Sequence, residues 1–364
     1  MKAPCQIALL AILSLNFLVG CNRGSSSQTS LTEPVSAQTT VSTDGHSSST
    51  DAAVATQVSE PTMLPGPNAV PSDTRIIVNI PAFRMDVFRD GTLLKSYKIG
   101  IGYVQYPLPR GLRKAEMIIF NPTWTQPNEP WATNPGEVVG AGAPGNPLGP
   151  IKVPIGGANL IHGGKALAKI GTFASHGCVG LTNDQVKDFA KVLADATQTD
   201  LTVEKMAWYL KRPTRTQVVK LKQVVPVELR YQTITVEDGK LHIYRDVYSQ
   251  KTNTEDNLRT VLEGNGFSFD KLSAEEQSQI RETLGIVSGR FPKKPPVAPV
   301  ANQNSEDRKA AAAARRAEAE RLRKLRSQKE FVIDIGGLTT KGYPAPVNLN
   351  TGARNTPAAS GANQ

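Results

Sequence analysis

The sequence is poor in cysteine, histidine and tryptophan. It has three cysteines, four histidines and three tryptophans among 364 residues. So few cysteines exclude a fold built on a disulfide framework. Cys5 and Cys21 lie close to the N-terminus, which leaves Cys178 as the one cysteine in the rest of the chain. An isolated thiol calls for an explanation, namely a reactive site, an intermolecular bridge or simple burial.

The sequence also lacks an apolar run long enough for a transmembrane helix. The mostly apolar run Ile7–Val19 is shorter than the roughly 20 residues that span a bilayer. With Lys2 before it, the run is typical of a signal peptide at residues 1–20. It ends in Leu-Val-Gly-Cys21, which resembles a bacterial lipobox and implies that Cys21 is acylated. We therefore expect an exported lipoprotein of the periplasm or cell envelope, held at a membrane through Cys21.

The chain has no excess of acidic residues. Lys and Arg number 42 against 32 Asp and Glu, which gives a net charge of +10. A basic balance favours an anionic neighbour such as a membrane surface, a cell-wall polymer or a nucleic acid. Because export argues against nucleic acid, the expected neighbours are the membrane and the cell wall.

Large apolar residues are almost absent from the segment after the lipobox. Such a segment buries too little surface to offset chain entropy, so we expect residues 21–73 to be a disordered tether. The rest of the chain is divided by composition and pattern. We expect a globular domain at 74–206, a β-hairpin extension at 207–250, a small helical and Pro-rich segment at 251–300, a charged Ala- and Arg-rich helix at 301–330, and a disordered tail at 331–364.

Alternating and β-branched residues predict that the globular domain is mainly β, with some helix. Asp90-Gly91 between two alternating segments predicts a tight hairpin turn. Thr182 and Gln185 have the spacing of a capping box, and helical apolar spacing follows them, which predicts one principal helix. Segment 121–150 is rich in Pro and Gly, which predicts a long irregular loop that carries two tryptophans.

The lone cysteine and two of the histidines lie in one stretch, Leu160-Ile-His-Gly-Gly to Ser175-His-Gly-Cys178. A thiol nucleophile acts as a thiolate, and a nearby imidazole can hold the thiolate as an ion pair. Gly177 permits a tight turn that aims amide N–H groups, that of Cys178 included, at one point, as an oxyanion hole requires. Ser175 offers a hydroxyl to hold this loop. The stretch predicts Cys178 as nucleophile and His162 as its base.

The order His-Gly, then Ser-His-Gly-Cys, resembles the signature of the L,D-transpeptidase catalytic domain, the YkuD-like family. Asn146-Pro-Leu-Gly-Pro150, ahead of the first motif histidine, also resembles that family. The resemblance covers about residues 74–206 and implies a mixed β-sandwich with one principal helix after the catalytic cysteine. It implies that Cys178 attacks the third residue of a peptidoglycan stem tetrapeptide, that His162 takes the thiol proton, and that an amine replaces D-alanine. We expect neither a metal nor a cofactor.

The same resemblance assigns roles to the neighbours of these two residues. It implies that the Gly163 carbonyl steadies the base, and that Ser175, His176 and Gly177 shape the pocket and the oxyanion site. One departure stands out, because the family usually has an arginine two residues after the cysteine and this chain has Gly180. The lost arginine would help to hold the pocket or a substrate carboxylate, so its absence leaves room for a changed substrate or a lower activity.

Other readings stay open. With water as acceptor the chain would be an L,D-carboxypeptidase or amidase of the same fold, and a protein amine is a further acceptor. A decayed site, suggested by Gly180, would make it an anchored peptidoglycan-binding protein. Papain-like peptidases place the cysteine before the histidine, and sortase-like enzymes have wider spacing and a downstream arginine, so both fit less well. Neither the acceptor nor the oligomeric state follows from the sequence.

Overall fold

The computed structural model describes residues 69–289 and 305–352. The expected signal peptide at 1–20, Cys21 and most of the expected tether at 21–73 lie outside these residues. Within the described residues, no helix is both long enough and apolar enough to cross a bilayer.

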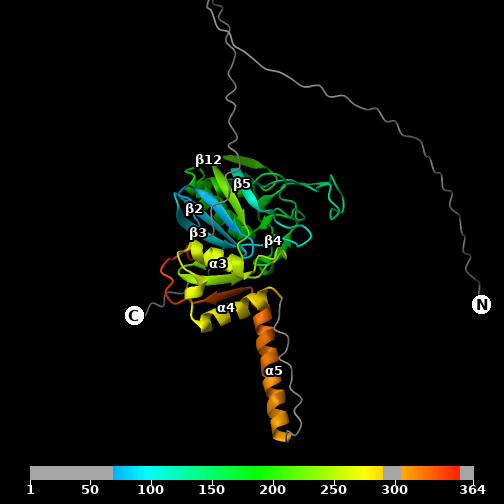
Figure 1. Ribbon diagram of the computed structural model, residues 1–364. Coiled ribbons are helices and arrows are strands. Elements are labelled where there is room, and N and C mark those ends of the chain that lie inside the picture. The colour runs from blue at the N-terminus through cyan, green and yellow to red at the C-terminus, as the bar shows by residue number, and fades with distance from the viewer. Residues whose placement is uncertain (1–68, 290–304, 353–364) are drawn as a thin grey trace, which may run out of the picture. The chain divides into compact units, whose positions relative to one another are not determined.

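The largest element of the fold is an eight-stranded mixed sheet (Figure 1), with strand order β11-β9-β8-β5-β12-β1-β2-β3. Its strands are β1 (Arg75–Asn79), β2 (Arg84–Arg89), β3 (Thr92–Lys98), β5 (Gly111–Phe120), β8 (Ile151–Pro154), β9 (Leu160–His162), β11 (Val179–Gly180) and β12 (Gln217–Arg230). β1 pairs in parallel with β12, and β9 with β11, whereas the other neighbours are antiparallel. The predicted mixed, mainly β fold with some helix is confirmed.

The hairpin that opens the sheet forms where the sequence predicts it. Asp90 and Gly91 join β2 to β3 with φ of 49° and 74°, the left-handed backbone that a tight two-residue hairpin turn needs. Two short strand pairs lie outside the large sheet. They are β4 (Ile101–Gly102) with β10 (Phe173–Ser175), and β6 (Trp124–Thr125) with β7 (Val138–Val139).

The predicted principal helix is α1 (Asn183–Ala196). The Thr182 side chain accepts from the Gln185 amide, and the Gln185 side chain accepts from the Thr182 amide, so the capping box is confirmed. Phe189 and Leu193 on its apolar face are fully buried against the sheet. A second, shorter helix, α2 (Val203–Leu210), follows it. The capped start of α1 therefore lies a few residues after Cys178.

The domain boundary expected at residue 206 is wrong, because it separates the sheet from one of its central strands. β12 lies between β5 and β1 and pairs with both. Val225, Val227 and Leu229 are fully buried in the same core as β1 and α1. The strand pattern was visible in the sequence, but its partners start about 140 and 105 residues upstream in the chain, and no local pattern reveals them.

A smaller three-stranded sheet has its own core. Its strands are β13 (Ile234–Glu237), β14 (Lys240–Tyr244) and β15 (Glu330–Ile333), packed with α3 (Glu255–Gly264) and α4 (Ala274–Val287). β13 and β14 form the hairpin expected there. The charged helix expected at 301–330 is α5 (Ser305–Ser327), orange in Figure 1, whose described side chains are mostly exposed. Two single-turn 3₁₀ helices span Leu167–Lys169 and Phe269–Lys271.

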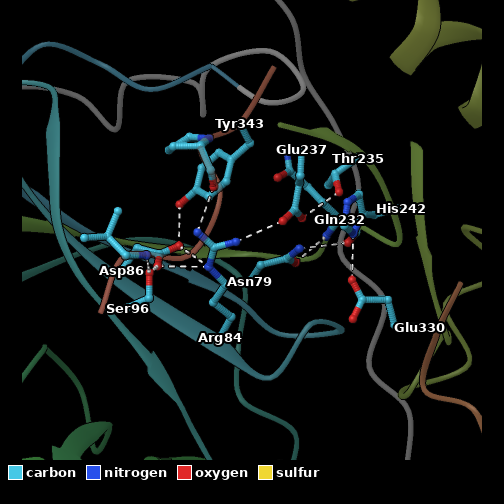
Figure 2. A network of polar contacts seen from close by, with 12 residues as sticks. Asn79, Arg84, Asp86, Ser96, Gln232, Thr235, Glu237, His242, Glu330 and Tyr343 are labelled. Carbon is cyan, nitrogen blue, oxygen red and sulfur yellow. Dashed lines mark hydrogen bonds and ion pairs between the residues drawn. The ribbon is translucent and has the colours of Figure 1, made fainter. Parts of the chain in front are cut away.

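The expectation of a disordered tail from residue 331 is wrong for residues 331–352. β15 adds to the small sheet, and Asn350 exchanges backbone hydrogen bonds with the edge strand β3. Tyr343 is buried and donates to Asp86 at 2.8 Å, while Arg84 bonds Asp86 and Glu237 beside it, as Figure 2 shows. Its low-complexity composition concealed this order, which comes from β-sheet pairing, from burial of Ile333 and Ile335 in the core of the small sheet, and from the polar network around Tyr343.

Candidate active site

The sheet brings His162 and the Cys178 turn to one end of two adjacent strands. His162 is the last residue of β9 and pairs with Gly180 of β11, and Cys178 immediately precedes β11. Both residues line a pocket of about 950 Å³. Ser175, His176 and Gly177 line it as well. The strand register thus gathers all but one of the catalytic and pocket residues predicted from the sequence, and the exception, Gly163, adjoins His162.

Ser175 closes the turn that carries the cysteine. Its hydroxyl donates to the Cys178 carbonyl at 2.6 Å and accepts from the Cys178 amide at 3.0 Å. Gly177 has φ of +96°, a backbone conformation that a side chain would strain. Asn159 donates to the Gly177 carbonyl at 2.6 Å. The predicted structural use of Ser175 and Gly177 is therefore seen, and Asn159 is a support that the sequence did not indicate.

One predicted oxyanion donor is already occupied. The Cys178 amide N–H, expected to point into an oxyanion hole, donates to Ser175 Oγ in this structure. Within residues 69–289 and 305–352, the Gly177 amide makes no hydrogen bond. Gly177, next to Cys178, therefore carries an amide donor with no partner among these residues, which makes it a candidate for an oxyanion donor.

His162 is held as a neutral imidazole. Its Nδ1 lies 2.7 Å from the Gly163 carbonyl, which fixes the proton on Nδ1 and leaves Nε2 as the basic nitrogen. Burial lowers the pKa of His162 to about 3, and the positive charge of Lys165 acts in the same direction. The expected partnership with the Gly163 carbonyl is present in the structure.

Cys178 rests as a thiol rather than as a thiolate. Burial raises the pKa of the thiol, an effect that the Leu160 backbone and the Lys165 ammonium oppose. Its sulfur lies 3.9 Å from the Ala158 carbonyl, and among the described residues no hydrogen bond joins it to His162. The thiolate–imidazolium pair suggested by the sequence is therefore not the resting state, because burial disfavours both charged forms.

The turn after His162 is fixed from two directions. The Gly164 amide donates to Asn183 Oδ1 at 2.8 Å, so the first residue of α1 reaches back to the histidine loop. A Cβ on Gly149 would come within 2.4 Å of the Gly164 nitrogen. The Asn-Pro-Leu-Gly-Pro segment noted in the sequence therefore packs directly against this loop, which explains its glycine.

Aromatic side chains form one wall of the pocket. Trp131, in the loop between β6 and β7, stacks on His176 with ring centroids 3.9 Å apart and an interplanar angle of 9°. Tyr103 and Tyr106 contact the same imidazole at 5.2 and 5.0 Å between centroids. His176 is thereby held within an aromatic wall, and both tryptophans of the predicted irregular loop line the pocket.

Sequence reasoning missed several residues in and around the pocket, among them two lysines. Lys152 and Lys165 line the cavity, and Tyr248 anchors the wall by donating to the Gly102 carbonyl at 2.9 Å. Lys165 stands three residues after the motif histidine and could have been singled out by that position, whereas nothing local marks Lys152 or Tyr248. Within the part of the chain that the structure covers, no group of His, Cys, Asp and Glu is arranged to hold a metal ion.

Part of the chain is similar in sequence to known proteins. The YkuD family, described as the L,D-transpeptidase catalytic domain, matches residues 73–216. A putative L,D-transpeptidase of Bacillus subtilis, YqjB, is 25% identical over 169 residues, which are 45% of this chain and 90% of that protein. A probable L,D-transpeptidase of Escherichia coli, ErfK/SrfK, is 34% identical over 120 residues, 31% of this chain and 38% of that protein.

Solved structures of low sequence identity are also similar to this chain. The catalytic domain of an Enterococcus faecium L,D-transpeptidase is 16% identical, with a TM-score of 0.30, covering 44% of this chain and all of that domain. An L,D-transpeptidase from Mycobacterium smegmatis is 17% identical, with a TM-score of 0.26, covering 43% of this chain and 58% of that one. The family match over residues 73–216 supports the assignment of that segment to the L,D-transpeptidase catalytic domain family.

Proposed function

We propose that this protein is a peptidoglycan L,D-transpeptidase in which Cys178 is the nucleophile and His162 the general base. The observation that carries the proposal is the pairing of β9 with β11, which brings the histidine and the cysteine turn to one pocket. The family match over residues 73–216 supports this class of reaction. Because His162 is neutral with its proton on Nδ1, its Nε2 has an unshared electron pair that can accept the thiol proton.

The first half-reaction forms a thioester. Cys178 gives its thiol proton to Nε2 of His162 as the sulfur attacks the carbonyl carbon of the third residue of a stem tetrapeptide. The Gly177 amide donates to the oxyanion that forms. The C–N bond to the fourth residue then breaks, His162 returns the proton to the departing amine, and D-alanine leaves. The acyl group remains on the sulfur.

The second half-reaction uses the same groups in reverse. An acceptor amine attacks the thioester carbon, and His162 takes a proton from the amine as the C–S bond breaks. That proton returns to the sulfur, which restores the thiol and releases the new amide. If water takes the place of the amine, the product is a carboxylate and the enzyme is a carboxypeptidase or amidase.

Muropeptide analysis separates these outcomes. Peptidoglycan that contains tetrapeptide stems is incubated with wild type or Cys178→Ala, digested with a muramidase and examined by liquid chromatography and mass spectrometry. We expect wild type to release D-alanine and to create stem-to-stem links from the third residue, and the variant to do neither. Release of D-alanine without new links would indicate hydrolysis. Unchanged muropeptides with wild type would favour an anchored binding protein.

We also propose that Cys21 anchors the chain to a membrane of the cell envelope, with the catalytic domain facing peptidoglycan. The lipobox-like Leu-Val-Gly-Cys21 sequence supports this, and it lies outside the described residues. In the native host grown with an alkyne fatty acid, wild type should acquire the label and pellet with membranes, whereas Cys21→Ser should acquire none. Unlabelled wild type, or equal labelling of both proteins, would rule out this anchor.

A further inference from the structure

Two lysines, Lys152 and Lys165, line the pocket, and their positive charges act on different sets of groups. Lys152 lies on β8 opposite His162. Lys165 follows the His-Gly-Gly turn, and its ammonium interacts electrostatically with Cys178 as well as with His162. Both lysines are half-buried. Of the two, Lys165 is the one whose charge acts on the reacting sulfur.

Backbone pairing holds Lys165 beside Gly180. The Leu181 amide donates to the His162 carbonyl at 2.8 Å, and the Lys165 amide donates to the Leu181 carbonyl at 3.1 Å. These bonds continue the β9–β11 pairing past the ends of both strands. As a result, the Lys165 side chain lies against Gly180 of β11 and lines the pocket together with Cys178.

Glycine at position 180 is explained by space rather than by backbone conformation. Gly180 does not have the left-handed backbone that side chains avoid. A Cβ built on it, however, would come within 2.8 Å of Cγ, 3.1 Å of Cε and 3.4 Å of Cδ of Lys165. The aliphatic part of Lys165 therefore occupies the volume that any side chain at position 180 would take.

The Lys165 ammonium also lacks an anionic partner. Among the ion pairs of the described residues, none involves Lys165, and burial lowers the pKa of its ammonium. A partly desolvated cation without a counter-ion is unfavourable, and a bound anion relieves that cost. The pocket is thus prepared for a negatively charged ligand close to Cys178.

We propose that Lys165 binds the terminal carboxylate of the donor peptide, and that Gly180 provides the space for its side chain. The proposal deepens the proposed function and rests on it. When the third residue of a tetrapeptide is attacked, only one amide nitrogen and one Cα separate the attacked carbon from the carboxylate of the fourth residue. A cation beside the sulfur meets that carboxylate, so the charge comes from position 165 and not from an arginine at position 180.

The test compares two alkylating reagents of similar size at Cys178. Iodoacetate is anionic and iodoacetamide is neutral, and the modified Cys178 peptide is quantified by mass spectrometry. Any change in thiolate fraction affects both rates equally, so their ratio reports the local charge. We expect Lys165→Gln to lower the iodoacetate-to-iodoacetamide ratio about fivefold or more, the effect of one unit charge about 4 Å away in water. Lys165→Arg should keep the ratio.

Two further variants test whether the position of the lysine matters in addition to its charge. Lys152→Gln removes the same charge from the same pocket and should change the ratio less than about twofold. Gly180→Val retains the lysine but displaces its stem, and should lower the ratio as Lys165→Gln does. An unchanged ratio in Lys165→Gln, or an equal fall in Lys152→Gln, would overturn the proposal without touching the proposed function.

A second readout depends on the proposed function. With tetrapeptide donors that end in a carboxylate or a carboxamide, wild type should prefer the carboxylate, chiefly through KM. Lys165→Gln should lose that preference, and Lys165→Arg should regain it. If neither alkylating reagent reacts with Cys178 of wild type, the sulfur is inaccessible, and both the Lys165 proposal and the proposed function fail.

Discussion

Cys178→Ala is expected to abolish covalent modification of this protein by a carbapenem. The strained lactam carbonyl is a target for the same sulfur that attacks the donor peptide, and the acyl group stays attached as a thioester. Intact-protein mass spectrometry should show wild type gaining one acyl group and Cys178→Ala gaining none. The loss is expected to be complete, because Cys178 is the only cysteine within residues 69–289 and 305–352 and Cys21 is proposed to carry lipid.

Ser175→Ala is the matched control for this experiment. It keeps the sulfur but removes the two hydrogen bonds that close the cysteine turn. We expect the same final stoichiometry, reached more slowly, since each lost hydrogen bond loosens the turn by about 1 kcal/mol. Wild type that gains no mass would favour a decayed site, and an adduct on Cys178→Ala would mean that another group is the nucleophile.

His162→Ala is expected to slow the same acylation by about 10²- to 10⁴-fold, the usual contribution of a positioned general base. Burial keeps Cys178 protonated at rest, so attack requires a group that takes the proton as the C–S bond forms. Rates are followed by mass spectrometry at fixed times. His242→Ala removes a histidine that pairs with Glu330 in the small sheet and should leave the rate within about twofold. Equal rates in wild type and His162→Ala would exclude His162 as the base.

The pH dependence of acylation follows from the burial of His162. The base works only when neutral, and the pKa of His162 is lowered to about 3, so protonation removes activity only as the pH falls toward that value. Wild-type acylation at pH 5 should therefore be close to that at pH 7. A histidine with the ordinary pKa of about 6.5 would lose more than nine-tenths of its neutral form by pH 5. A tenfold fall in rate between pH 7 and pH 5 would contradict the buried, neutral base.

The elements predicted correctly from the sequence were those specified by a few adjacent residues. The Asp90-Gly91 turn and the capping box at Thr182 follow from a few adjacent residues, because turn and cap geometry depend on near neighbours in the chain. The candidate site was equally local. Its cysteine, histidines, serine and glycines lie within one short stretch, and the structure gathers them as expected because β9 and β11 pair directly.

The residues around the candidate site could not be predicted from local sequence, because they come from distant parts of the chain. Lys165 lies near Cys178 because backbone pairing continues past the ends of β9 and β11. Tyr248 donates to the carbonyl of Gly102, which is 146 residues away in the sequence. Trp131 could be marked as a loop tryptophan, yet only the folded loop stacks it on His176. Contacts of this kind have no period or spacing that a sequence displays.

The sequence by itself determined which residues are candidates for the chemistry and which local turns and caps lie beside them. Only the tertiary structure decided that β12 lies at the centre of the sheet, that Tyr343 is buried in a polar network, and that His162 and Cys178 both rest uncharged. The physical reason is common to all three. Strand partners, burial and electrostatic surroundings are set by segments distant in the chain, whereas propensity and motif spacing are set by neighbours.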